Sequence, residues 1–175
     1  MQLKKKVAGF SAGVLAAAGV VYLRSSGDDL NKFETFESAE GRFSVSMPKG
    51  PDKITQKVKS PDENLQEDID FTMFVADLKQ VGFIVGYSDY SQEFIDSSDP
   101  MQNLDRVSEG IAAEFEGELV KDTELEKYGV PAKEYQVKIP DKGILTSRLI
   151  LDGTRLYQLM AMFPPNAQYD KKLTE

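Results

Sequence analysis

Carboxylates are the side chains of this sequence that most readily suggest chemistry, because five of them gather in one short polar stretch. Carboxylate oxygens of this kind suit hard cations such as Ca²⁺ or Mn²⁺. The spacing does not match an EF-hand loop, and a solvated acidic loop is the favoured interpretation, since charged loops are ordinary protein surface. The five candidate ligands are Asp62, Glu63, Glu67, Asp68 and Asp70.

A second cluster combines acids and hydroxyls. Asp89, Asp96 and Asp99 stand among several serines. The chain has no histidine and no cysteine, so a serine nucleophile would need a lysine as its base, and thiol catalysis is excluded. Asp99-Pro100 is a typical helix start, with Asp at the cap and Pro in the first turn. A helix-capping loop is therefore favoured over an active site.

Two arginines flank a predicted β-hairpin and could bind anions. Arg148 and Arg155 lie on either side of Asp152-Gly153, a dipeptide that strongly favours a hairpin of type I′, with positive φ at both central residues. Pairing of each arginine with an acid on the neighbouring strand is the favoured alternative to an anion site.

The hairpin, residues 144–163, is apolar on both faces near its turn, so it belongs in the middle of a sheet with cover on each side. Leu104, Val107, Ile111 and Phe115 recur at helical spacing and predict a helix from Pro100 that ends at Gly117. Short turns join most strands, which indicates a mainly antiparallel sheet. Alternating residues predict further strands at 42–47, 53–59, 69–78, 81–87, 118–127 and 132–139, with a second helix beginning at 166–175.

This order of elements predicts an α+β fold: a central, mainly antiparallel β-sheet with helices packed on both faces. The alternation slips near Asp70, which indicates either a β-bulge or a strand buried on both sides. The tyrosines are expected at the edges of the core with their hydroxyls in water; they are Tyr87, Tyr90, Tyr128, Tyr135 and Tyr157.

Residues 7–23 carry no charge and follow Lys4-Lys5-Lys6, which predicts a transmembrane signal anchor. A cleaved signal peptide using Ala16-Ala17-Ala18 is an alternative, and a buried core helix is disfavoured because the segment has no polar face. Gly9 and Gly13 could pack on another membrane helix, although small residues are common in weak spans. The expected division is a basic N-terminus at 1–6, an anchor at 7–23, a tether at 24–32 and a folded domain at 33–175.

Charge sets the expected orientation and partners. Lysines before the anchor place the N-terminus on the cytoplasmic or stromal side and the domain on the periplasmic or lumenal side. Residues 1–27 hold four basic residues and no acid, which leaves 17 basic and 29 acidic residues in the remaining chain, a balance of −12. So acidic a domain is a poor nucleic-acid binder, and it favours a partner surface with basic residues or one bridged by cations. The lysines beside the acidic stretch are candidate partner contacts: Lys53, Lys57 and Lys59.

Several turns are similar to those of a known family. Glu40-Gly41-Arg42-Phe43 with Met47-Pro48, Gly86-Tyr87-Ser88-Asp89-Tyr90, Gly129-Val130-Pro131 and, most closely, Arg148 to Leu159 resemble the PsbP-like domain of the Mog1/PsbP fold, over residues 36–165. The resemblance implies a central antiparallel sheet with helices on both faces and a non-enzymatic role. Relatives serve as extrinsic or assembly subunits of photosystem II, or as periplasmic or membrane-tethered domains. The anchor in front and the early end after the last predicted helix depart from the family pattern.

The expected function is therefore that of a non-enzymatic, membrane-tethered accessory or assembly subunit of a membrane protein complex, which acts by protein–protein contact in the periplasm or thylakoid lumen. No cofactor is expected. The alternative is a periplasmic protein that binds a small ligand or a cation in a pocket between sheet and helix. The lack of histidine, cysteine and glycine-rich phosphate loops disfavours catalysis.

The anchor gives a direct prediction. Full-length protein is expected to partition with membranes and to resist extraction by alkaline carbonate, because the segment 7–23 has no charge. Fractionation of expressing cells measures this. Recovery of a soluble mature form that begins near Gly19 would instead establish the cleaved signal peptide.

Overall fold

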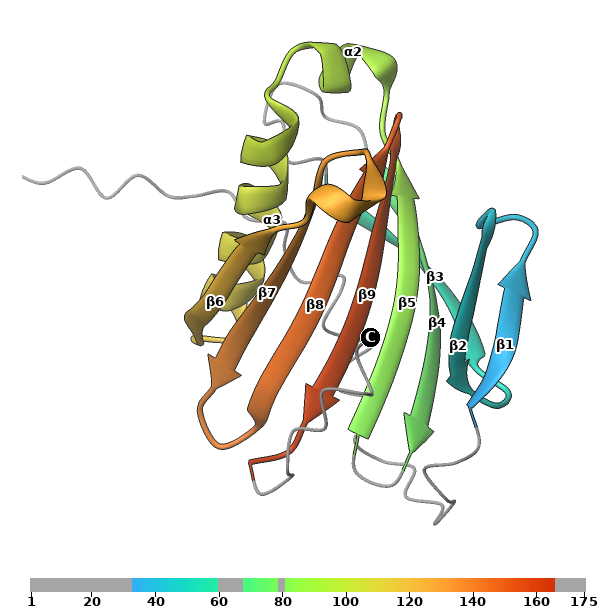
Figure 1. Cartoon of the computed structure of the whole chain (residues 1–175), viewed down its shortest axis with the longest axis vertical. Coiled ribbons are helices and arrows are strands. Elements are labelled where there is room, and N and C mark those ends of the chain that lie inside the picture. The colour runs from blue at the N-terminus through green and yellow to red at the C-terminus, as the bar shows by residue number, and fades with distance from the viewer. Residues whose placement is uncertain (1–32, 60–67, 79–80, 166–175) are drawn as a thin grey trace, which may run out of the picture.

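The computed structural model describes residues 33–59, 68–78 and 81–165. Within them lies a seven-stranded sheet in the order β3-β4-β5-β9-β8-β7-β6, with every neighbouring pair antiparallel (Figure 1). The predicted antiparallel sheet is confirmed, and the β8–β9 hairpin is in its middle. The strands are β3 (Asp52–Lys59), β4 (Asp68–Leu78), β5 (Val81–Asp89), β6 (Glu118–Glu124), β7 (Ala132–Ile139), β8 (Gly143–Asp152) and β9 (Arg155–Phe163).

The two faces of this sheet have different covers. Helices α2 (Gln92–Asp96) and α3 (Pro100–Glu114) lie on one face. A separate two-stranded sheet of β1 (Phe33–Ser38) and β2 (Phe43–Pro48) lies on the other, next to β4 and β5 (Figure 1). Helices were expected on both faces, but among the described residues both helices share one face. The second helix expected at 166–175 lies outside the described residues.

Alternate residues of the central strands supply the two cores, as their apolar pattern predicts. Leu149 of β8 and Leu156 of β9 pack with the α3 residues Leu104 and Val107. The next residue of β9, Tyr157, packs instead in the cluster under β1–β2. The cover that the central hairpin requires is therefore present on both sides.

The slip in alternation near Asp70 has a simple cause. The pairing of β3 with β4 runs through Asp70 without a break, and residues 71–74 are all buried. Of the two explanations, burial on both sides is confirmed and the bulge is wrong. The bulge in this sheet lies in β6, where the register shifts between Leu119 and Lys121 and leaves the Val120 side chain 48% exposed.

The turn of the central hairpin differs from the predicted type. Asp152 pairs with Arg155 inside the ladder, so the two central residues are Gly153 and Thr154. Positive φ occurs at Gly153, at +59°, and not at Asp152 or Thr154. Glycine at the first central position is the requirement of a type II′ turn. The hairpin is confirmed, and the prediction of a type I′ turn is wrong.

Three short elements were not predicted from the sequence: strand β1, helix α2 and a 3₁₀ helix that follows β6. Strand β1 has few buried positions because it is half of a two-stranded sheet. Helix α2 has five residues and buries only Phe94, too few for a helical period. Strand β6 ends at Glu124, before the predicted 127, because a 3₁₀ helix, η1 (Glu126–Tyr128), follows. No helix in the described ranges is long and apolar enough to cross a membrane; residues 7–23, with Gly9 and Gly13, lie outside them.

A buried ammonium group joins α3 to the edge of the sheet. Lys133 of β7 is 1% exposed, and its Nζ lies 2.5 Å from an Asp105 carboxylate oxygen on α3 and 2.8 Å from one of Asp122 on β6. Burial alone would lower the pKa of Lys133, but the hydrogen bonds that its ammonium donates to both carboxylates outweigh this effect and raise the pKa. The charge is therefore kept and ties three elements together.

The tyrosines are more deeply placed than expected. Tyr87, Tyr90 and Tyr135 are at most 8% exposed, and their hydroxyl oxygens are buried as well. The expectation of hydroxyls in water is wrong for these three, because the strands that carry Tyr87 and Tyr135 lie inside the sheet. The Tyr157 hydroxyl donates a hydrogen bond to the Gly41 carbonyl at 3.0 Å.

The central position of the hairpin predicts the cost of truncation. Leu149→Ala and Leu156→Ala are each expected to lower the free energy of unfolding by about 2–5 kcal/mol, because both side chains are at most 2% exposed. Urea titration measures this. Val120→Ala is the control, since that side chain is exposed and its loss should cost about 0.5 kcal/mol or less. Losses below about 1 kcal/mol at both leucines would contradict the central placement.

Candidate functional site

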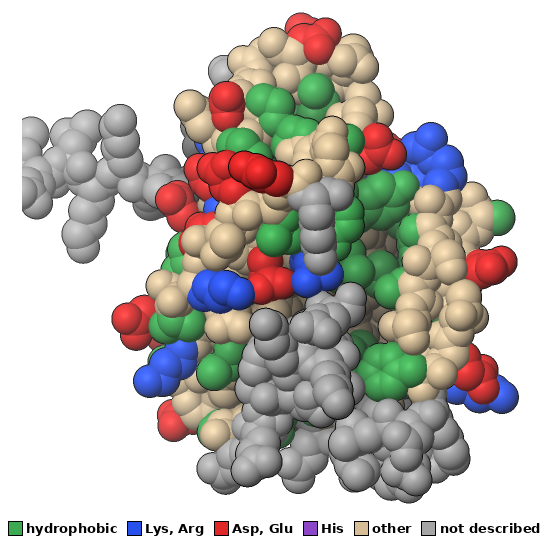
Figure 2. Space-filling model, viewed as in Figure 1, with side chains coloured by type: hydrophobic (Ala, Val, Ile, Leu, Met, Phe, Trp, Pro, Cys, Tyr) green, Lys and Arg blue, Asp and Glu red, His purple; other side chains and the backbone are tan. Residues whose placement is uncertain are grey.

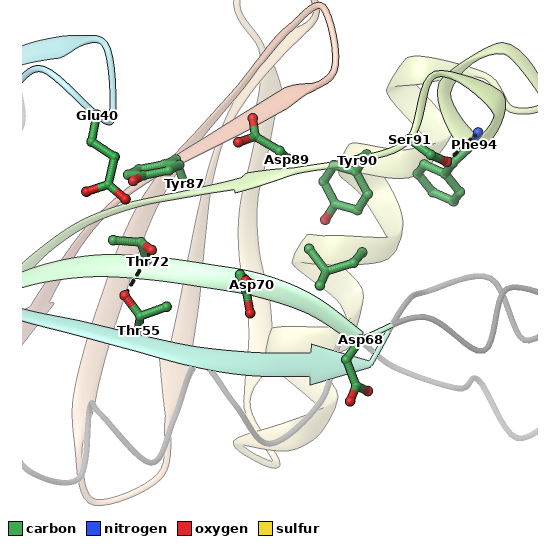
Figure 3. A pocket seen from close by; sticks show the side chains of 11 residues that line it. Glu40, Thr55, Asp68, Asp70, Thr72, Tyr87, Asp89, Tyr90, Ser91 and Phe94 are labelled. Atoms are coloured by element: carbon green, nitrogen blue, oxygen red, sulfur yellow. Dashed lines mark hydrogen bonds between the residues drawn. The ribbon is translucent and has the colours of Figure 1, made fainter.

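A groove opens where β4 and β5 separate. Their ladder ends at the pair Phe71–Ser88. Beyond it, β4 continues to Asp68 beside β3, while β5 continues to Asp89 beside β9. Figure 3 shows the two strands diverging at this point. The groove has a volume of about 380 Å³, and its lining comes from β3, β4, β5, α2 and the β1–β2 turn.

Hydrogen-bond acceptors dominate the lining of this groove. Four carboxylates, five hydroxyl-bearing side chains and two apolar residues, Ile69 of β4 and Phe94 of α2, surround it, and none of the lining residues is a lysine or an arginine. On the floor, the Thr55 and Thr72 hydroxyl oxygens lie 3.1 Å apart (Figure 3). The complete lining is Glu40, Thr55, Asp68, Ile69, Asp70, Thr72, Tyr87, Asp89, Tyr90, Ser91 and Phe94.

Arg155 fixes one end of the groove. Its Nε and Nη2 each lie 2.6 Å from an Asp89 carboxylate oxygen, and its Nη1 donates to the Glu40 carbonyl at 2.8 Å. The guanidinium also stacks on the Tyr87 ring, 4.5 Å from its centroid. One side chain of β9 therefore binds the end of β5 and the β1–β2 turn together. The hydrogen bonds from Arg155 hold the pKa of Asp89 below its ordinary value.

Tyr87 brings a buried polar atom to the groove. The residue is 5% exposed, and its hydroxyl makes no hydrogen bond of standard geometry. Burial raises the pKa of Tyr87; Thr72 opposes this shift and Glu40 adds to it. In Figure 3, the hydroxyl lies beside the Glu40 carboxylate and above Thr72. The Tyr87 hydroxyl therefore interacts with side chains of the fold itself, those of Glu40 and Thr72.

The structure describes two of the five acids of the predicted cation site. Asp68 and Asp70 lie on β4 and line the groove, and the Lys57 Nζ lies 3.2 Å from Asp70. Asp62, Glu63 and Glu67 lie outside the described residues. Among the residues that the structure describes, no three acids are grouped so as to hold a metal ion.

The hydroxyl and acid cluster of residues 88–99 is divided between helix caps and the groove. Asp99 caps α3, with its Oδ1 accepting from the Gln102 N–H at 2.9 Å, and Ser91 caps α2. Asp96 accepts a hydrogen bond from Gln92 at 2.8 Å. The helix-capping interpretation is confirmed for Asp99 and Ser91, while Asp89 belongs to the groove.

The predicted basic residues are found in ion pairs. Arg148 lies 2.8 Å from Glu134, its neighbour on β7, and Arg155 pairs with Asp89 across β5 and β9. Cross-strand pairing is thus confirmed over anion binding. Lys53 pairs with Glu40, and Lys57 with Asp70, both at the rim of the groove. Lys59 is the last residue of β3.

A smaller hollow lies between the β1–β2 sheet and the central strands. Its volume is about 180 Å³, and Figure 2 shows apolar side chains in this recess. Met47 of β2, Val85 of β5 and Leu159 of β9 line it, and Arg148 and Glu134 reach its far wall. These last two side chains pair with each other, and the buried side chains of Thr146 and Ser147 also line the hollow.

Sequence reasoning missed several members of the groove. Glu40 was predicted only as part of a turn motif, and Thr55 and Thr72 only as members of the strands at 53–59 and 69–78. Their cross-strand register, Thr55–Thr72 and Thr72–Tyr87, places them in one row, and nothing within a single strand indicates this. The signal available in the sequence is that three strands, each with an apolar face, carry a hydroxyl side chain at Thr55, Thr72 and Tyr87.

Comparisons of the chain with known protein families, curated proteins and solved structures found no match. The function is therefore inferred from the geometry of the groove and from the sequence.

The Arg155–Asp89 pair predicts a specific response to acid. Because the folded-state pKa of Asp89 is lowered, its contribution to stability is present above the unfolded pKa of about 3.9 and is lost as pH falls through the lower folded value. Asp89→Asn is therefore expected to destabilise the protein near pH 6 and to differ less from wild type near pH 3. Urea titrations at both pH values measure this. A difference that stays constant, or grows, on acidification would contradict the pairing.

Proposed function

We propose that this chain is a non-enzymatic accessory or assembly subunit of a membrane protein complex, and that it binds a basic segment of a partner protein in the groove between β4 and β5. The anchor predicted at 7–23 would hold the domain on the periplasmic or lumenal side. A membrane tether raises the effective concentration of the domain near membrane partners, so a modest groove affinity is sufficient.

The observation that carries this proposal is the charge of the groove lining. Glu40, Asp68, Asp70 and Asp89 contribute carboxylates. The cations that pair with three of them, Lys53, Lys57 and Arg155, are not among the lining residues. The chain beyond residue 27 also has a balance of −12, which attracts basic surfaces over longer distances. A partner with lysine or arginine side chains fits both features. The groove is open along the diverging strand ends, which suits a protein segment better than an enclosed small molecule.

The second candidate is the binding of a small ligand or cation in the same groove. Its volume of about 380 Å³ is within the range of small-molecule sites. Such sites are predominantly apolar, however, and this lining is mostly polar. Among the lining residues there is no nucleophile held by a base, as a hydrolytic site requires. Protein contact is therefore the better-supported function.

The fold is compatible with the family that the sequence resembles. A central antiparallel sheet with helical cover on one face is compatible with the PsbP-like sandwich, and we extend the proposal to that family, with a second helical layer and the membrane anchor. A photosynthetic complex is then among the candidate partners.

The charge of the groove gives the test of this function. Full-length chain is isolated from detergent-solubilised native membranes at low salt, and co-purifying proteins are quantified. Asp70→Asn is expected to reduce the recovered partner several-fold, because one groove carboxylate is lost. The thermal midpoint should change little, since exposed ion pairs such as Lys57–Asp70 contribute little to stability.

Glu109→Gln is the matched control, because this exposed acid lies on α3 outside the groove. It should leave co-purification unchanged, and raised salt should weaken binding of both wild type and control. If Asp70→Asn retains as much partner as the control, the groove is not the contact. If the purified chain turns over a substrate, the subunit proposal fails.

A further inference from the structure

The hollow between the β1–β2 sheet and the central strands exists because of one small residue. On this face of β9, Leu159 and Phe163 present large side chains, and Ala161 between them presents only a methyl group. The cross-strand neighbours of Ala161 are Phe83 on β5 and Thr146 on β8, and both line the hollow. The volume that Ala161 does not fill is therefore bordered by an aromatic ring on one side and by a hydroxyl side chain on the other.

The hydroxyl of Thr146 is the polar group that a ligand could use. The Thr146 side chain is 4% exposed, and its hydroxyl oxygen is buried without a hydrogen-bond partner in the described part of the chain. A buried hydroxyl in this state costs free energy. Because a threonine hydroxyl can both donate and accept, a hydroxyl group on a ligand can serve as its partner in either direction.

The charged side chains at the far wall favour a neutral ligand. The Arg148 Nη2 lies 2.8 Å from a Glu134 carboxylate oxygen, and Glu134 also accepts from the Lys121 Nζ at 2.6 Å. These charges compensate one another within the fold. A charged ligand would enter the apolar hollow without a counter-ion of its own, which is costly.

The size and walls of the hollow favour a single aromatic ring. Its volume is about 180 Å³, and an apolar cavity of about 150 Å³ is large enough for benzene. Phe33 of β1 meets Phe83 of β5 edge to face, with ring centroids 5.3 Å apart and an interplanar angle of 87°, and both rings line the hollow. A further ring can join such an arrangement through the same edge-to-face contacts.

We propose that this hollow binds a free, neutral small molecule of the phenol class, with its aromatic ring against Ala161 and its hydroxyl group at Thr146. The hollow is bounded on opposite sides by the small sheet and by the central strands (Figure 2), and such enclosure suits a small molecule. The site goes beyond the proposed function and does not depend on it, since the hollow and the groove share no lining residue.

The test compares phenol with toluene, which has nearly the same shape but no hydroxyl group. Each is titrated into methyl-labelled full-length chain in detergent, and the methyl signals of Val85 and Leu159 are followed by NMR. Because micelles also dissolve both compounds, Ala161→Leu supplies the background: its larger side chain fills the hollow and should remove the saturable shifts. Wild type is expected to bind phenol several-fold more tightly than toluene.

Thr146→Val separates recognition of the hydroxyl from simple filling of space. It is expected to raise the dissociation constant of phenol about tenfold, the usual effect of one lost hydrogen bond, and to leave that of toluene nearly unchanged. Its thermal midpoint should not fall, because a hydroxyl without a partner is removed. Thr123→Val, at an exposed threonine of β6, is the matched control and should alter neither constant.

Three results would overturn the proposal. The first is the absence of saturable shifts in wild type beyond those of Ala161→Leu. The second is an equal effect of Thr146→Val on phenol and toluene. The third concerns N-acetyltyrosinamide, which carries the same ring on a peptide backbone and is expected to bind several-fold more weakly than phenol. Equal or tighter binding of this compound would make the occupant a tyrosine of a partner protein instead of a free molecule.

Discussion

The constraint on which this structure depends is that its central strands are apolar on both faces. β5, β9 and β8 bury Ile84, Leu156 and Leu149 on one side and Val85 and Tyr87 on the other, so neither face can be left to water. Helices α2 and α3 cover the first face. The second is covered in part by β1–β2, which makes no strand pair with the main sheet. The small sheet is held by aromatic packing, in which the Phe43 ring lies 5.9 Å from Phe74 and 6.2 Å from Tyr157, and by Arg155.

The groove is a consequence of how this second cover is attached. Arg155 holds the end of β5 against β9 through Asp89 and fixes the β1–β2 turn through the Glu40 carbonyl. β4 follows β3 instead, so the sheet opens between β4 and β5. The same contacts that hold the cover in place therefore create a recess with carboxylates on both walls. Acids on neighbouring strands repel each other and weaken a sheet. Here the negative charge of Asp70 is balanced by Lys57 and that of Asp89 by Arg155.

The sequence predicted those parts of the fold that depend on repeated local patterns. The central hairpin, the strand pairs around it and α3 with its Asp99 cap follow from alternation, helical spacing and capping chemistry. Pairing of Arg148 and Arg155 with acids also followed, because each stands opposite a carboxylate once the strands are in register. Strand β1 and helix α2 could not be predicted, since each buries too few residues for a period. The groove escaped prediction for a different reason: it depends on where two strands stop pairing, and Glu40, Thr55 and Tyr87 are far apart in the chain. The buried Lys133 likewise reads as a surface lysine until Asp105 and Asp122 are brought beside it.

The absence of cysteine from the chain allows the most direct test of the groove as the binding surface. Thr55→Cys places a single thiol on its floor, and Glu109→Cys places one on the exposed side of α3. Each full-length variant is modified with a bulky maleimide in native membranes, and partner recovery after solubilisation is compared with that of the unmodified variant. The account predicts that modification at position 55 abolishes partner recovery while modification at position 109 leaves it intact. Equal recovery after modification at the two positions would contradict it.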